Sequence, residues 1–128
     1  MIKNLWSNKE SEKFKDDLEL RVYTSRLLGQ DSTLVLHGGG NTSVKITETN
    51  VVGEQEEILY VKGSGWDLAS IEKAGFSPVR MAHMVKLSKL ESLSDPQMVN
   101  ELKTQLTNSS APAPSVETIL HAILPFKY

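Results

Sequence analysis

The stretch Glu57-Ile58-Leu59-Tyr60-Val61-Lys62-Gly63-Ser64-Gly65 decides the fold of this chain, because an apolar run passes directly into a glycine loop. The apolar character of residues 57–62 predicts a strand. The loop after it can present backbone N–H groups and a short hydroxyl at the strand end, which an anionic oxygen requires. Taken alone the loop is ambiguous, since glycines also make ordinary turns.

A second glycine loop lies upstream, in His37-Gly38-Gly39-Gly40-Asn41-Thr42-Ser43. Residues 33–37 read as a strand that runs into it, and the alternation in residues 43–47 predicts another strand. Three glycines can form a hairpin, or they can let the backbone approach an anion. The polar residues 48–55 predict a hairpin turn, so we expect antiparallel neighbours whose glycine loops meet at one edge of the sheet.

The N-terminal part predicts one long helix. Ser7 and Glu10 form a capping-box pattern, and Phe14, Leu18 and Val22 fall near one helical face. Gly29 is placed to end this helix in a left-handed conformation.

The C-terminal half predicts three further helices. Their expected starts are Ser77-Pro78, Ser94-Asp95-Pro96 and Ser115. The second should run through Leu106, and Pro125 should stop the third. Residues 126–128 look like the approach to another strand.

Glu117 and His121 are one helical turn apart in this last helix. A glutamate near a helix start is most often a capping acid, favoured by the helix dipole. A Glu/His pair at this spacing can also act as acid and base, bind a metal, or lie idle on the surface. The residues alone leave these alternatives open.

Composition narrows the class of protein. The 128 residues carry a formal net charge of −2, 39% hydrophobic and 23% charged residues, and no cysteine. These values are typical of one ordinary globular domain without a nucleic-acid partner, and they exclude disulfide scaffolds and cysteine-based zinc sites. No apolar run approaches the roughly 20 residues that cross a bilayer. Residues 1–17 lack the apolar segment of a signal peptide. We therefore expect a cytoplasmic protein with no membrane partner.

The motifs, taken in order, resemble the class II aldolase and adducin head family. The matching pieces are Gly40-Asn41-Thr42-Ser43, the strand into Gly63-Ser64-Gly65, and Pro114-Ser115-Val116-Glu117 with His121. This family includes the fuculose- and rhamnulose-phosphate aldolases and the ribulose-phosphate 4-epimerases.

The resemblance implies an α/β fold, three-layer α/β/α with a mainly antiparallel sheet, incomplete at the C-terminus here. Family members are usually cyclic tetramers with sites between subunits. The resemblance also implies that Asn41, Ser64, Gly65 and Ser115 hold the substrate phosphate, and that Glu117 is the catalytic acid/base at the enediolate carbon. Zinc, held by an H-x-H pair shortly after the glutamate helix and by a third histidine, would polarise the ketose carbonyl.

The sequence departs from the family pattern at two points, and both affect the expected activity. The H-x-H pair would lie beyond Tyr128, so we expect no zinc ligand and no bound zinc in this chain. Val116 stands where a second serine is common, which removes one hydroxyl from the phosphate cradle. Without zinc, Glu117 cannot stabilise the carbanion. We expect residues 1–128 to be the N-terminal portion of a single class II aldolase/adducin-like domain, inactive alone.

Three functional hypotheses follow. Residues 60–68 and 76–80 resemble the branch whose aldolase domain is fused to a short-chain dehydrogenase, which favours a zinc-dependent aldolase acting on a phosphorylated ketose such as rhamnulose 1-phosphate. The second hypothesis is a non-catalytic, adducin-like binding or assembly module. The third is a sugar-phosphate 4-epimerase. In each case we expect a homo-oligomer.

Overall fold

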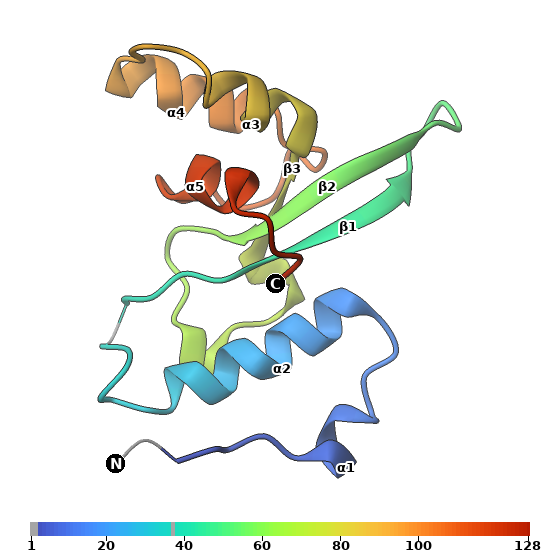
Figure 1. The fold of residues 1–128 in the computed structure, drawn as a ribbon, viewed down its shortest axis with the longest axis vertical. Coiled ribbons are helices and arrows are strands. Elements are labelled where there is room, and N and C mark those ends of the chain that lie inside the picture. The colour runs from blue at the N-terminus through green and yellow to red at the C-terminus, as the bar shows by residue number, and fades with distance from the viewer. Residues whose placement is uncertain (1–2, 37) are drawn as a thin grey trace.

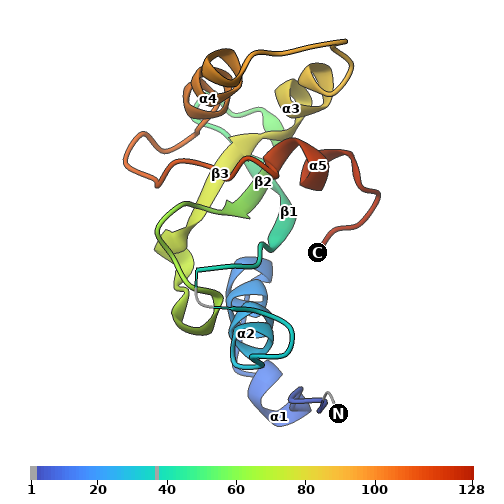
Figure 2. The same cartoon turned by 90° about the vertical axis from the view of Figure 1, so that its left-hand side faces the viewer.

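A computed structural model describes residues 3–36 and 38–128, and its described part is a sheet between two helical layers (Figure 1). The strands β1 (Ser43–Thr49), β2 (Gln55–Lys62) and β3 (Phe76–Arg80) pair antiparallel in the order β1-β2-β3. Helix α2 (Asp17–Gly29) covers one face. On the other face lie α3 (Met81–Leu87), α4 (Asp95–Thr104) and α5 (Thr118–Ile123) (Figure 2). The expected α/β fold, three-layer and antiparallel, is confirmed.

Strand β2 is the centre of this arrangement, because it is paired on both edges and covered on both faces. Leu59 and Val61 lie opposite Val79 and Ser77, and these residues point toward the α3–α5 layer. The core on that side comprises Leu59, Val61, Val79, Met81, Met84, Leu87, Leu102 and Ala122. A smaller cluster on the α2 side comprises Val22, Ile71 and Phe76.

The N-terminal part forms two helices, so the single helix expected from Ser7 to Gly29 is wrong. Ser7 does cap a helix, but this helix, α1 (Asn8–Ser11), has four residues. Asp16 then caps α2, its carboxylate accepting from the N–H of Glu19 at 2.7 Å. The break lets Phe14 stack on Tyr23 of α2, with ring centroids 5.1 Å apart.

Gly29 ends α2 without the left-handed conformation that we expected, because its φ is not among the positive ones. A close contact explains the glycine. A Cβ atom added to Gly29 would lie 2.2 Å from the backbone nitrogen of Ala69, in the 3₁₀ turn Leu68–Ser70. The glycine thus lets this turn pack against the end of α2.

The strand expected at residues 33–37 is wrong over its described part. Residues 32–34 form a turn, and residue 37 lies outside the described residues. The Asp31 carbonyl accepts from the N–H groups of Leu34 and Val35, both at 3.0 Å, and its carboxylate accepts from the N–H of Thr33 at 2.9 Å. Aspartate favours turns through such local bonds, which here outweigh the apolar run.

The helix expected to start at Ser77-Pro78 is also wrong, since these residues belong to β3 and α3 begins at Met81. The Pro78 carbonyl accepts from the N–H of Thr107 at 3.0 Å, on the side of β3 away from β2. Because Pro78 directs its backbone groups away from β2, its lack of an N–H removes no hydrogen bond from the β2–β3 pairing.

Helix α4 has the expected capping box. The Ser94 hydroxyl accepts from the N–H of Gln97 at 3.3 Å, and the Gln97 side chain accepts from the N–H of Ser94 at 3.2 Å. The helix ends at Thr104 and not at Leu106, because the chain there turns to pair with β3.

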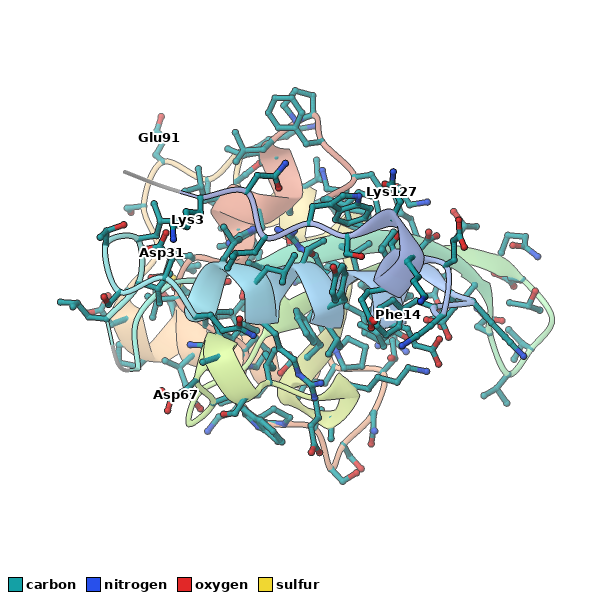
Figure 3. All side chains as sticks on the ribbon, turned by 90° about the horizontal axis from the view of Figure 1, so that it is seen from below. Lys3, Phe14, Asp31, Asp67, Glu91 and Lys127 are labelled. Carbon is teal, nitrogen blue, oxygen red and sulfur yellow. The ribbon has the colours of Figure 1, made fainter. Side chains whose placement is uncertain are left out.

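Helix α5 begins after Glu117, which is the N-cap residue, so the expected cap at Ser115 is wrong. The helix ends just before Pro125, as expected. The C-terminal tail forms no strand, but the Lys127 carbonyl accepts from the N–H of Lys45 at 2.9 Å. The Lys127 ammonium lies 2.7 Å from Asp17 at the start of α2 (Figure 3).

No helix within the described residues combines the length and the apolar character that crossing a bilayer demands.

Replacing Gly29 with alanine should lower the free energy of unfolding by about 1–3 kcal/mol, because the new methyl group meets backbone atoms of the 3₁₀ turn. Gly53→Ala is the matched control. Gly53 has a φ of +84° and nothing within 4 Å, so its replacement should cost only about 1 kcal/mol of backbone strain. Urea unfolding compares the two. Equal losses would contradict the close-contact explanation.

Candidate functional site

The two glycine loops meet at one end of the sheet. Strand β1 leaves the first loop and β2 enters the second, and the Lys62 N–H donates to the Thr42 carbonyl at 3.0 Å. The Gly38 N–H donates to the Asp67 carboxylate at 2.7 Å. The common edge that the sequence predicts is therefore present, although β1 and not residues 33–36 provides the first of the two strands.

A third segment, residues 112–117, joins the second glycine loop through its backbone. The Ser64 N–H donates to the Ala113 carbonyl at 2.9 Å, and Gly63 forms an antiparallel bridge with Pro114. A Cβ on Gly63 would lie 2.4 Å from Cγ of Pro112, so a glycine is needed for this approach. The contact brings Ser64 and the segment that carries Ser115 side by side.

Two of the predicted phosphate ligands have polar atoms that are buried without a hydrogen-bond partner among the described residues. They are Oδ1 of Asn41 and Oγ of Ser115. Leaving such an atom unpaired costs about 1–3 kcal/mol, and a ligand that pairs with it relieves that cost. An amide that turns by 180° offers N–H donors instead, and a hydroxyl can donate, so both groups suit a phosphate oxygen.

Ser64, Gly65 and Glu117 are solvent-exposed. Gly65 has a φ of +88°, which an L side chain adopts only under strain. The Glu117 side chain makes no capping hydrogen bond to α5. The capping role that a glutamate at a helix start most often plays is therefore wrong for Glu117.

The pairing of Ser43 with His121 is a feature that sequence reasoning missed. The Ser43 hydroxyl lies 2.8 Å from Nδ1 of His121, across 78 positions of sequence. His121 was a candidate only through its spacing from Glu117. No local pattern signals the pair, because its two residues are 78 positions apart in the sequence.

His121 has a lowered pKa. Burial is the first cause, and the positive charge of Arg21 on α2 adds to it. Glu117 opposes the shift, and Lys45 on β1 reinforces it. The imidazole is therefore held neutral near pH 7.

The donor set for a metal does not fit within the described residues, where no three His, Cys, Asp or Glu side chains gather. Zinc, which the resemblance to the family implies, therefore meets no cluster of three such side chains among the described residues.

The comparisons with known proteins agree with the fold. The family described as "Class II Aldolase and Adducin N-terminal domain" matches residues 19–124. A solved structure, the N-terminal class II aldolase domain of a conserved protein from Thermoplasma acidophilum, is 45% identical with a TM-score of 0.90. The alignment covers 99% of this chain and 58% of that chain.

A curated relative, "Uncharacterized oxidoreductase YuxG" of Bacillus subtilis (strain 168), is 39% identical over 128 residues. The alignment covers all of this chain and 19% of the relative, so the chain spans about a fifth of that protein. The fold is thus that of a class II aldolase domain. The chain belongs to the class II aldolase and adducin N-terminal domain family.

The lowered pKa of His121 predicts a pH dependence of stability. Between the folded-state pKa and the ordinary value of 6.5, the unfolded chain binds more protons than the folded chain. The free energy of unfolding should therefore be fully retained above about pH 6.5 and should fall as the pH is lowered through this window. Urea unfolding from pH 8 to pH 5 measures the slope. His121→Asn should flatten it. An unchanged slope would contradict the prediction.

Proposed function

We propose that this chain is part of a class II aldolase-type lyase that cleaves a phosphorylated ketose, such as rhamnulose 1-phosphate, to dihydroxyacetone phosphate and an aldehyde. One observation carries the proposal. The backbone contact between Ser64 and Ala113 places the second glycine loop beside Ser115, whose hydroxyl is buried and has no hydrogen-bond partner in the described part of the chain. The family membership supports it.

In this proposal Asn41, Ser64, Gly65 and Ser115 bind the substrate phosphate. All four are neutral, so they recognise the phosphate through hydrogen bonds, from the Asn41 amide, the two serine hydroxyls and backbone N–H groups. Val116 is exposed and offers no hydroxyl, so the site has one donor fewer than the usual family pattern.

Glu117 is the proposed acid/base. In retro-aldol cleavage the bond between the ketose carbons breaks as the alcohol oxygen loses its proton and becomes the aldehyde. The electron pair stays on the ketose side as an enediolate, and a proton delivered to the enediolate carbon completes dihydroxyacetone phosphate. Glu117 is exposed and makes no capping bond, so its carboxyl is available to move that proton.

Stabilising the enediolate requires an electrophile, and no three His, Cys, Asp or Glu side chains gather among the described residues to hold a metal ion. We propose that the zinc ligands lie outside them, that this chain binds no zinc by itself, and that residues 1–128 alone bind the phosphate group without turnover. The same argument keeps a non-catalytic, adducin-like binding module as the second candidate for the isolated chain. A sugar-phosphate 4-epimerase would share the phosphate loops and the carboxylate, and substrate assays separate it from an aldolase.

We further propose that the protein acts in the cytoplasm as a homo-oligomer, without nucleic-acid or membrane partners.

Ser115→Ala should weaken the binding of inorganic phosphate to the 128-residue chain about tenfold, because it removes one hydrogen bond to a charged group. NMR titration of backbone amides measures the dissociation constant. Ser110→Ala is the matched control, because Ser110 also lies between α4 and α5 and is exposed. This substitution should leave the dissociation constant unchanged. If both variants bind as the wild-type chain does, Ser115 does not hold the phosphate.

Glu117→Gln should lower kcat by at least about 100-fold in a longer form of the protein that contains the family's zinc ligands, because proton transfer loses its base. The dissociation constant of inorganic phosphate should stay unchanged. Glu91→Gln, an exposed glutamate between α3 and α4, controls for the loss of charge. Turnover of Glu117→Gln at the wild-type rate would remove Glu117 from the mechanism.

A further inference from the structure

Backbone and side-chain hydrogen bonds both hold the site segments together. The first glycine loop joins the second through the backbone bond from Lys62 to the Thr42 carbonyl. The second loop joins residues 112–115 through the backbone bond from Ser64 to the Ala113 carbonyl. Among the described residues, the first loop joins α5 through a side-chain contact, between Ser43 and His121.

The Ser43–His121 contact has a well-defined environment. Ser43 is 4% exposed and lies opposite Val61 in the sheet register, so its hydroxyl points toward the α3–α5 layer. His121 is half-buried on α5, and the Nδ1–Oγ distance of 2.8 Å is that of a good hydrogen bond.

Burial and the positive charges of Arg21 on α2 and Lys45 on β1 lower the pKa of His121 and favour the neutral ring. Glu117, the residue before α5, acts in the opposite direction. The Arg21 Nε is itself buried without a partner among the described residues. A neutral imidazole keeps the bond to Ser43 in either tautomer, with Nδ1 as acceptor or as donor.

We propose that Ser43 and His121 are a positioning pair, which sets the separation between the loop that carries Asn41 and the segment that carries Ser115 and Glu117. Ser43 lies directly after Asn41 and Thr42, and His121 lies one helical turn after Glu117. The pair touches neither phosphate nor reacting carbon; it places the groups that do. Its effect on ligand binding rests on the proposed function, whereas its effect on the geometry does not.

Two substitutions of His121 separate a positioning role from simple packing. Asparagine places an amide near the position of Nδ1, so His121→Asn keeps a partner for Ser43. Glutamine places its amide near the position of Nε2, so His121→Gln loses that partner. Both remove the titration of the ring. Ser43→Ala removes the bond from the other side.

Inorganic phosphate binding to the 128-residue chain is the first readout. His121→Gln and Ser43→Ala should each weaken it about three- to tenfold, His121→Asn less than about twofold, and the Ser43→Ala/His121→Gln double variant no more than either single one. Equal losses for asparagine and glutamine, or additive losses in the double variant, would overturn the proposal.

Amide hydrogen exchange is the second readout and needs no ligand. His121→Gln should speed exchange of the Lys62 amide, which is bonded to the first loop. Ser43→Ala should speed exchange of the His121 amide, which is bonded to the Glu117 carbonyl. The Leu59 amide at the sheet centre should not respond. If the wild-type chain fails to bind phosphate, the proposed function is wrong. The exchange rates still test whether Ser43 and His121 position the two segments. Unchanged exchange at Lys62 and His121 would overturn it.

Discussion

The pairing of β2 on both of its edges is the constraint on which the rest of the structure depends. Because β1 and β3 run antiparallel to β2, the start of β1 and the start of β3 both lie beside its end, where the chain enters Gly63. The first glycine loop precedes β1, so the register alone brings it to the second loop. Gly63 has no side chain and so leaves room for Pro112, which allows residues 112–117 to lie beside the two loops. A shift of β2 by one residue would turn Leu59 and Val61 out of the core and separate all three segments.

The site built at this end is held by two kinds of force. Backbone hydrogen bonds join the two loops to each other and to residues 112–115, and they do not depend on side-chain identity. The link between the first loop and α5 depends on a serine and a histidine, and burial together with Arg21 lowers the pKa of that histidine. The buried, unpaired atoms of Asn41 and Ser115 lie within this frame. Each such atom lowers the free energy of unfolding by about 1–3 kcal/mol. A protein retains atoms of this kind where its function uses them.

The sequence predicted much of the fold, and each failure has its own physical cause. Strands β1 and β2, the capping box at Ser94 and the stop before Pro125 were all predictable, because each depends on local spacing. Residues 33–36 and Ser77-Pro78 were assigned wrongly, because a local hydrogen bond of Asp31 and a pairing of β3 with residues 105–107 outweighed local propensity. Gly29 was expected at a left-handed helix end and is instead a point of close packing.

Some features of the candidate site follow from the sequence, and others depend on the tertiary structure. The sequence by itself determined the family, the strand that enters Gly63-Ser64-Gly65, and the residue types suited to a phosphate and to proton transfer, because motif order and spacing are properties of the chain. Only the tertiary structure decided that Glu117 lies outside α5 as its N-cap and that Ser43 meets His121. It also decided that the Ser115 hydroxyl is buried with no partner among the residues described. Contacts between residues 78 positions apart depend on strand register and on how the layers pack, and no local pattern records either.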